Sequence, residues 1–286
     1  MKILKEYIEY IFAYIFKIFV LIFPEELLKY FLKSIIPIVK FFIYERQRSM
    51  IKNFHLSFQD KTPKEVLKTI NNVWYNVGWT FISAVKYINN PKKIFLKVKF
   101  KNKEKLKNLS CNTIIFSAHI GNWELLAQRL VLEGYKVAAI VRELRNKFVD
   151  TEINKLREKL GGKIFYAHQI KEIMNYLKSG GIVYLLPDQH IVEGSVRVEF
   201  LGRLAFTTPI ITLLNKRLKS KIIPMFCIKV KDEYEIFIED EFLPKYTGDM
   251  RKDLEFNTLR MNKIIEKYIK LYADQWMWLH RRWKEK

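Results

Sequence analysis

Cysteine is nearly absent from this sequence, and its scarcity limits the chemistry that the chain can hold. The 286 residues include two cysteines, Cys111 and Cys227, which are too few for a disulfide framework and lack the ligand spacing of a zinc site. Both lie in apolar, strand-like stretches, so we expect buried free thiols that behave as small apolar side chains. Nothing in this usage calls for an oxidising compartment, and no metal site is predicted.

Acidic residues are also under-represented. The chain carries 30 Asp and Glu against 51 Lys and Arg, a formal net charge of +21 at pH 7. An excess of this size favours an anionic partner: a nucleic acid, an acidic lipid or an acidic carrier protein. No known nucleic-acid reader motif is present, and nucleic-acid binding would leave the apolar N-terminus without a role, so we predict no nucleic-acid partner. The hydrophobic content of 49% is ample for a core and excludes global disorder.

No apolar run is long enough for a simple membrane-spanning helix. The most apolar stretch, residues 8–23, would form a helix of roughly 24 Å with a lysine in its middle, whereas the hydrocarbon core is ~30 Å thick. Pro-Glu-Glu follows instead of a small-residue cleavage site, so a signal peptide fits poorly. Residues 27–44 are also apolar, with dispersed lysines. We predict that residues 1–44 are helices that anchor the chain on a membrane, spanning it or lying on it, and that residues 45–286 form the main globular domain. A pair of core helices is the alternative.

Beyond this region, short apolar strands alternate with amphipathic helices, and no repeat or low-complexity linker interrupts them. The predicted strands are residues 95–100, 113–118, 137–141, 164–166, 182–186, 194–202, 222–226 and 234–238. The predicted helices are residues 63–81, 122–134, 147–160, 170–178, 208–218 and 254–272. Such alternation implies right-handed crossovers and an α/β fold with a mostly parallel central sheet flanked by helices. The entirely apolar run at 182–186 predicts a central strand.

Three polar segments follow directly on predicted strands. They are His119, Arg142 and the Pro-Asp-Gln turn at residues 187–189. Carboxyl ends of parallel strands meet at one edge of a sheet, where ligand sites usually lie. We therefore expect these residues to share one site.

His119 and Glu124 are separated by a break between strand and helix. On one continuous helix, five residues turn the chain by about 500°, and the two side chains would face different ways. Gly121 and the expected N-cap Asn122 place His119 before the helix, so the two side chains can converge. A histidine held by a carboxylate is the general-base half of a triad-like arrangement, and without a nearby GxSxG elbow the attacking oxygen is expected to come from a substrate. The alternative is a turn histidine beside a capping glutamate.

The segment His119-Ile-Gly-Asn-Trp-Glu124 resembles the H-x4-D/E motif of membrane glycerolipid and lipid A acyltransferases. Its Gly-Asn-Trp-Glu filling is closest to the lipid A late-acyltransferase family. A second block at residues 187–208, with a Pro-Asp-Gln turn, a Val-x-Val-x-Phe strand and a Thr-Thr pair, is similar to the same family, although leucine replaces one of its aromatic residues. The tail at residues 274–284, with the run Trp-Met-Trp-Leu-His-Arg-Arg-Trp, is similar to the family's C-terminal signature. Together the blocks cover roughly residues 45–284.

The resemblance implies a membrane-associated O-acyltransferase that needs no metal or organic cofactor. Such an enzyme moves a fatty acyl group from acyl carrier protein, or another acyl thioester, to a hydroxyl of a phosphorylated acyl-glucosamine lipid. It implies a glycolipid acceptor, a membrane surface as partner, and a location at the cytoplasmic face of the bacterial inner membrane. A lysophospholipid or glycerol-phosphate acyltransferase is the alternative, because those families share the H-x4-D/E motif.

The resemblance also implies roles for individual residues. His119 matches the family's base and Glu124 its supporting acid, which would fix the histidine tautomer and stabilise the imidazolium. Arg157 and Asp188 match two further functional residues.

We also predict residues that contact the substrates. They are Asn122, Trp123, Arg142, Arg145 and Gln189. Arg142 and Arg145 suit an acceptor phosphate, because guanidinium forks match phosphate oxygens. The tryptophans of the C-terminal block, Trp276, Trp278 and Trp283, are candidates to line a lipid pocket or to lie at the bilayer interface, with plain packing expected for at least one.

Overall fold

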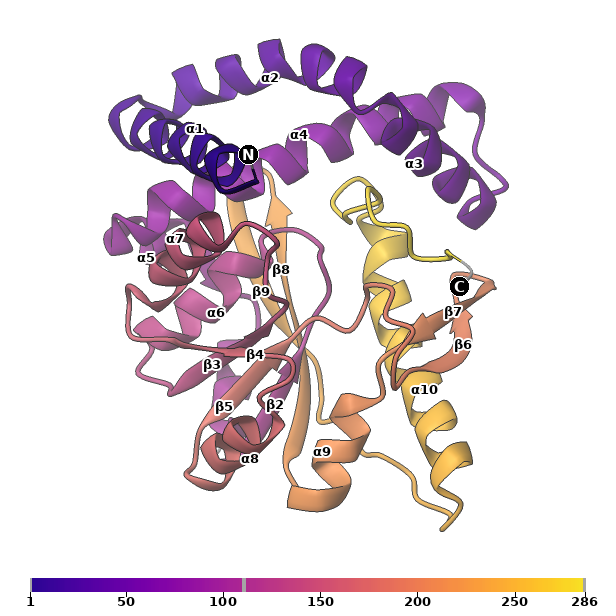
Figure 1. The fold of residues 1–286 in the computed structure, drawn as a ribbon. Coiled ribbons are helices and arrows are strands. Elements are labelled where there is room, and N and C mark those ends of the chain that lie inside the picture. The colour runs from indigo at the N-terminus through magenta and orange to yellow at the C-terminus, as the bar shows by residue number, and fades with distance from the viewer. Residues whose placement is uncertain (1, 110–111, 285–286) are drawn as a thin grey trace.

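A seven-stranded sheet runs through the centre of the structure, a computed structural model that describes residues 2–109 and 112–284 (Figure 1). In spatial order its strands are β1 (Val98–Phe100), β9 (Glu233–Ile238), β8 (Lys221–Val230), β2 (Thr113–Phe116), β5 (Ile182–Leu185), β3 (Val137–Val141) and β4 (Lys163–Tyr166). Neighbouring strands are parallel except β8 and β9, which form an antiparallel hairpin. The predicted α/β fold with a mostly parallel sheet is confirmed.

Apolar side chains on both faces of the central strands explain why helices cover both faces of the sheet. Along β2, Ile114 and Phe116 face one apolar cluster, whereas Ile115 faces another. Every residue of β5 is buried, as the apolar run predicted for a central strand. Parallel pairing of β2 with β5 sets Phe116 opposite Leu185, so these strands end at the same level. That register positions the site described below.

Helices pack on both faces of this sheet and above its carboxyl edge. They are α1 (Lys2–Ile22), α2 (Glu25–Phe42), α3 (Tyr44–Ser57), α4 (Pro63–Ile88), α5 (Pro91–Lys97), the 3₁₀ helix η1 (Lys103–Asn108), α6 (Trp123–Leu132), α7 (Lys147–Glu158), α8 (Ile170–Lys178), α9 (Ile210–Leu218) and α10 (Met250–Leu271). The long helix α4 contributes side chains to both apolar clusters. It begins with a capping box between Thr62 and Glu65, and Pro63 occupies its first turn.

Two local predictions were wrong. Residues 91–97 are helical, and only Val98–Phe100 of the predicted strand 95–100 pairs with the sheet, because Pro91 starts a short helix instead. The second error is a strand at residues 203–207 that was not predicted, whereas the helix predicted over residues 208–218 is present as Ile210–Leu218. Residues 196–207 form a separate antiparallel hairpin of β6 (Val196–Phe200) and β7 (Arg203–Thr207). Leu201 and Gly202 both have positive φ at its turn, as two-residue type I′ turns require.

Both cysteines were predicted to be buried free thiols, and the structure describes one of them. Cys227 is buried and free in β8, as predicted. Cys111 lies outside the residues that the structure describes.

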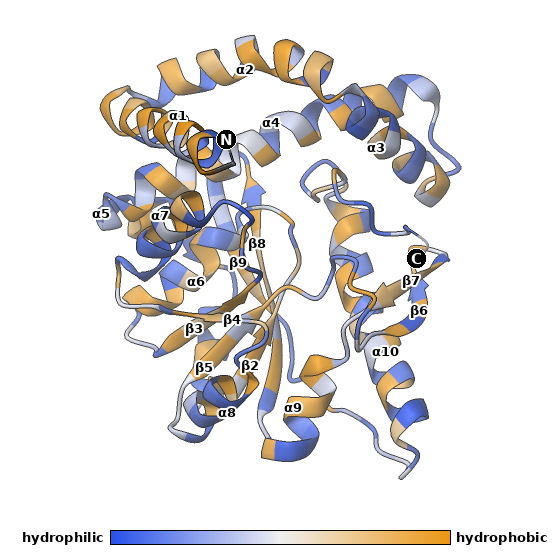
Figure 2. Ribbon diagram, viewed as in Figure 1, coloured by the Kyte–Doolittle hydropathy of each residue, from blue (hydrophilic) through white to orange (hydrophobic). Residues whose placement is uncertain are grey.

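The two N-terminal helices are rich in apolar residues (Figure 2), and many of these side chains are exposed. On α1 the exposed side chains include Ile3, Leu4, Ile8, Phe12, Ile15, Phe16 and Ile22; on α2 and just after it they include Tyr30, Ile38, Phe41, Phe42 and Tyr44. The same helices bury Val20, Leu28 and Leu32 in a core cluster with α4. Among the helices of the described chain, none combines the length and the apolar character needed to cross a membrane.

Candidate active site

His119 lies on a short loop between β2 and α6 that contacts with β8 hold in place. The backbone N–H of Asn122 donates to the Cys227 carbonyl oxygen at 2.8 Å. Gly121 has φ +59°, and a Cβ at this position would lie 2.0 Å from that same oxygen. Because no other residue fits without moving backbone, Gly121 lets the loop pass close to β8 and fixes where His119 points.

The imidazole of His119 is paired with the carboxylate of Asp188. Nδ1 lies 2.8 Å from Oδ1, and the His119 backbone N–H donates to Oδ2 at 2.9 Å. Each residue follows its strand end by three positions, so the level ends of β2 and β5 bring them together. This corrects the expectation that Glu124 fixes the tautomer, because the carboxylate at Nδ1 is that of Asp188. The register of β2 and β5 brings Asp188 to the imidazole, although Glu124 is closer in sequence.

Asp188 is a buried, ionised carboxylate. Burial alone would raise its pKa, but the charge of His119 and hydrogen bonds from His119 and Trp276 outweigh that effect and lower the pKa to about 2. Since the ionised Oδ1 can only accept, Nδ1 of a neutral His119 carries the proton and Nε2 keeps its lone pair. The Gln189 amide nitrogen lies 3.1 Å from Nε2 and donates to it. The second ring nitrogen is therefore unprotonated, and it can act as a base when a substrate hydroxyl takes the place of the Gln189 amide.

Glu124 instead forms a two-pronged ion pair with Arg157. Arg157 Nε donates to Oε2 at 3.0 Å, and Nη2 donates to Oε1 at 2.6 Å. Burial raises the pKa of Glu124, but the charge and hydrogen bonds of Arg157 outweigh it, with a smaller contribution from His119, and the net shift is downward. Gln128 on α6 donates to the Arg157 carbonyl oxygen at 2.7 Å, which ties α6 to α7. Glu124 thus sits near His119 as an ionised group that holds an arginine.

A cavity of about 1200 Å³ opens in front of His119. Trp123 lines it and sets its ring edge-on to His119, with centroids 5.2 Å apart. Apolar side chains from several elements form much of the remaining wall, among them Val131, Ile140, Ile153, Ile173, Ile210 and Leu213. The exposed Arg142 and Arg145 also line it. A base, an ion pair and an apolar hollow therefore share one space, which suits acyl transfer onto a hydroxyl.

Comparison with known proteins identifies the family. A family model described as "Bacterial lipid A biosynthesis acyltransferase" matches residues 1–285. The chain belongs to this family. It is 28% identical over 241 residues to the lipid A biosynthesis acyltransferase 2 of Shigella flexneri, covering 82% of this chain and 76% of that protein. It is 25% identical to the lipid A biosynthesis myristoyltransferase of Escherichia coli strain K12 over 82% of this chain and 73% of the relative. The resemblance noted in the motifs is confirmed, and the chain is an acyltransferase.

In this acyltransferase most of the predicted site residues line the cavity. They are His119, Trp123, Glu124, Arg142, Arg145, Arg157 and Gln189. Asp188 lies behind His119, almost wholly buried. Asn122 does not meet the prediction of a substrate contact, because it is fully buried and its polar atoms are engaged. Its Oδ1 accepts from Leu125 N at 3.1 Å as the N-cap of α6, and its Nδ2 donates to Ser83 Oγ at 2.9 Å.

The C-terminal block positions the acyltransferase site, a role that the sequence interpretation missed. Trp276 Nε1 donates to Asp188 Oδ2 at 2.8 Å, and the Met277 N–H donates to the His119 carbonyl oxygen at 2.9 Å. Arg282 donates to the carbonyl oxygens of Phe206 and Gln189. Trp276 and Trp278 are both buried, so neither lines a lipid pocket or reaches a bilayer. The concentration of tryptophan and arginine in this tail was the signal that could have revealed its role.

Proposed function

We propose that this acyltransferase moves a fatty acyl group from acyl carrier protein to a hydroxyl of a phosphorylated acyl-glucosamine lipid. The observation that carries the proposal is the pairing of His119 with Asp188 at the cavity wall, with the Nε2 lone pair available. Family membership gives the reaction class. The carrier-protein donor and the glucosamine-lipid acceptor are what the resemblance to the family implies, and the roles of the residues are inferred from the chemistry of the site.

His119 acts as the general base. An acceptor hydroxyl replaces the Gln189 amide at Nε2 and gives its proton to that nitrogen as its oxygen attacks the thioester carbonyl carbon. Asp188 stabilises the imidazolium that forms, through the bond to Nδ1–H. When the tetrahedral intermediate collapses, the carbon–sulfur bond breaks, the thiolate takes the proton from Nε2, and the ester remains on the acceptor.

Arg157 and Glu124 act as a fixed dipole in the cavity wall. Two hydrogen bonds hold the guanidinium in one orientation, so its charge is preorganised and does not depend on solvent. Arg142 and Arg145 are exposed at the cavity, and we assign them to the acceptor's phosphate groups, which guanidinium binds bidentately. The apolar wall receives an acyl chain.

The N-terminal helices hold the enzyme at the cytoplasmic face of the inner membrane. Their exposed apolar side chains and dispersed lysines suit helices that lie at the membrane surface. This position brings the cavity to a lipid acceptor while an acidic, water-borne carrier protein meets the basic surface.

The test is a side-by-side assay of the full chain with acyl carrier protein as donor. One arm supplies the phosphorylated acyl-glucosamine lipid and the other lysophosphatidic acid, each in mixed micelles. We expect faster acylation of the glucosamine lipid and a loss of about 10²–10⁴ in rate for His119→Ala. His168→Ala is the matched control, because that histidine lines the same cavity but contacts neither Asp188 nor Glu124 in the described structure. Faster acylation of lysophosphatidic acid would favour the alternative acceptor class, and full activity of folded His119→Ala would refute the mechanism.

A further inference from the structure

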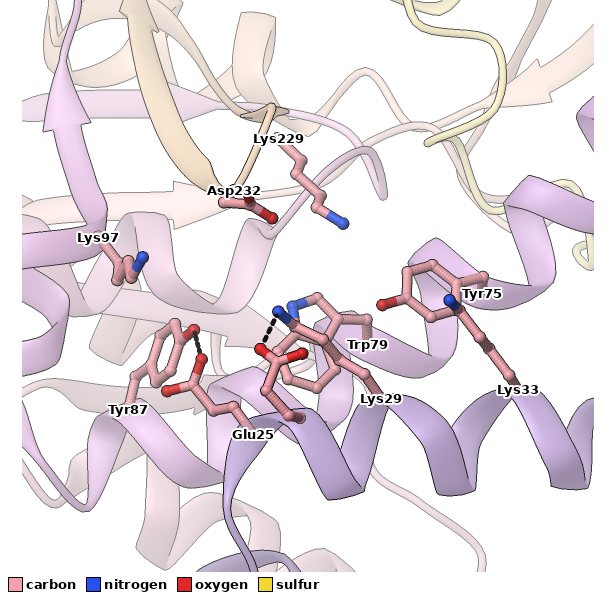
Figure 3. Close-up of a pocket in the computed structure, with 10 residues that line it drawn as sticks. Glu25, Lys29, Lys33, Tyr75, Trp79, Tyr87, Lys97, Lys229 and Asp232 are labelled. Atoms are coloured by element: carbon pink, nitrogen blue, oxygen red, sulfur yellow. Dashed lines mark hydrogen bonds and ion pairs between the residues drawn. The ribbon is translucent and has the colours of Figure 1, made fainter.

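A second pocket, of about 420 Å³, lies between α2, α4 and the turn that joins β8 to β9 (Figure 3). It is lined by Glu25, Glu26, Lys29, Lys33, Tyr75, Trp79, Tyr87, Lys97, Lys229 and Asp232. None of these residues lines the cavity at His119. The pocket is therefore distinct from the acyltransferase site, and its occupant does not follow from the proposed reaction.

Lysines dominate the free charge of this pocket. Glu26 is paired with Lys29 at 2.7 Å, and Glu25 is engaged by Lys93 and by the hydroxyl of Tyr87. Three other lysines, Lys33, Lys97 and Lys229, form no ion pair with any residue that the structure describes. Asp232 is then the one lining carboxylate left to balance them, again counting only the described residues.

The arrangement brings like charges together around two aromatic rings. Figure 3 shows Lys33 reaching from α2 and Lys229 from the end of β8 toward Tyr75. Their ammonium nitrogens lie 5.8 Å and 5.1 Å from the centre of that ring, and the Lys29 nitrogen lies 5.7 Å from the centre of the Trp79 ring. These cation–π contacts offset part of the repulsion.

The pKa of Lys229 reflects burial and the electrostatic repulsion that remains between the lysines. This side chain is half-buried, and burial lowers its pKa; the charges of Lys29 and Lys33 lower it further, while Asp232 and Asp274 act in the opposite direction without reversing the shift. An anion placed among these lysines would replace mutual repulsion with attraction. Because three unpaired ammonium groups face one space, a polyanion fits better than a single negative charge.

We propose that this pocket binds a phosphate group, carried either by an anionic lipid headgroup or by a free phosphate compound. Lysine ammonium groups bind phosphate as point charges, and the volume suits a phosphate with a small attached group. A headgroup source is compatible with the position of the pocket, since α2 supplies part of its wall and exposes Tyr30, Phe41 and Phe42 elsewhere on its surface.

The test compares the full chain with Lys33→Ala/Lys229→Ala and with a charge-matched control. Lys5→Ala/Lys52→Ala serves as the control, because those lysines are exposed on the N-terminal helices α1 and α3, outside the pocket. Lys33→Arg/Lys229→Arg keeps the charge and should retain binding. If thermal melting shows that Lys229→Ala impairs folding, the double variant Lys33→Gln/Lys97→Gln is used instead. Both positions lie on helices, where glutamine is well tolerated.

Two sets of probes separate the sources of phosphate. Titration calorimetry with inorganic phosphate and with glycerol 1-phosphate measures soluble ligands. Co-sedimentation at physiological salt with vesicles of phosphatidylcholine, alone or mixed with phosphatidylglycerol, measures headgroups with general surface attraction screened. We expect the pocket variant to bind roughly tenfold more weakly than the control to at least one set. A loss confined to the mixed vesicles assigns the site to a lipid headgroup, and a loss with the soluble probes assigns it to free phosphate. Equal binding by the pocket variant and the control to every probe would overturn the proposal, whatever the acyltransferase activity.

Discussion

Replacing Asp188 by asparagine tests whether the carboxylate sets the tautomer of His119. Oδ2 of Asp188 accepts two N–H groups, from the His119 backbone and from Trp276, so the amide oxygen of an asparagine must take that position. Its NH₂ group then faces Nδ1 and can only donate. His119 would be driven to the tautomer with the proton on Nε2, where it cannot accept one from the acceptor.

The expected result for Asp188→Asn is a fall in kcat of about 10²–10⁴ with little change in KM, because the cavity wall keeps its shape. The matched comparison is Glu124→Gln, which also exchanges a carboxylate for an amide but weakens the pair with Arg157 instead. It should leave the histidine tautomer unchanged. Nitrogen NMR of labelled His119 gives the tautomer directly. An unchanged kcat in folded Asp188→Asn, or a proton that stays on Nδ1, would refute this reasoning.

The same substitution has a signature in stability. The folded pKa of Asp188, about 2, lies below the unfolded value near 3.8, so ionisation stabilises the fold above about pH 4 and this stabilisation is lost as the pH falls toward 2. The shift corresponds to ~2–3 kcal/mol for this buried group. Denaturant unfolding should therefore show a larger gap between the wild type and Asp188→Asn at pH 7 than at pH 3. An equal gap at both pH values would mean that the charge of Asp188 does not contribute.

Three further predictions follow from named contacts. Arg157→Lys replaces two hydrogen bonds to Glu124 with a single contact, so we expect kcat/KM to fall about tenfold and the melting temperature to drop. Unchanged values would show that this ion pair does not orient the site. Trp276→Phe keeps an aromatic ring but leaves Asp188 Oδ2 short of one donor; unfolding measurements should show a loss of ~1–3 kcal/mol, and no loss would contradict the importance of that hydrogen bond. Phe12→Asp/Ile15→Asp puts charge on the exposed face of α1, so co-sedimentation with vesicles should decrease at unchanged melting temperature, and undiminished binding would locate the membrane contact elsewhere.

Point substitutions of this kind test the proposed membrane contact of the N-terminal helices better than a deletion does. Removing residues 1–44 would release the exposed apolar surface, as the anchor prediction requires, but it would also remove Val20 and Leu28, which are fully buried with α4. Loss of activity after such a deletion would not separate membrane binding from folding. The boundary at residue 44 stays a prediction.

Local sequence patterns predicted where strands and helices lie better than they predicted which strands pair with one another. The apolar runs at 113–118 and 182–186 identified two central strands, because strands buried on both faces must be apolar throughout. The caps at Thr62 and Asn122 placed two helix starts, since a cap acts within three residues of its own position. The predicted strand at residues 194–202 contains β6, but β7 and its pairing with β6 were missed, because the turn between them is formed by Leu201, a residue that rarely adopts positive φ.

Sequence spacing likewise directed attention to Glu124 and not to Asp188. An acid five residues from His119 is visible in any reading of the motif, whereas Asp188 is 69 positions away and reaches the imidazole only through the pairing of β2 with β5. Spacing cannot reveal register between strands. The expectation that His119, Arg142 and the Pro-Asp-Gln turn share one sheet edge was sound, since Asp188 contacts His119 and Gln189 shares the cavity with Arg142. Only the structure shows that the carboxylate hydrogen-bonded to His119 is that of Asp188.

The C-terminal segment holds the active-site residues in place, although it has no direct role in the proposed reaction. Trp276, Met277 and Arg282 lie within one C-terminal stretch, and they bond respectively to Asp188, to the His119 backbone and to the Gln189 backbone. Arg282 is fully buried among carbonyl oxygens, and burial lowers its pKa to about 10, so it stays charged at neutral pH without a carboxylate partner in the described structure. Burying an unpaired guanidinium is costly, and apolar packing would serve stability better. We infer that its hydrogen bonds to the Gln189 loop and to β7 hold the base and the residues around it in a single arrangement.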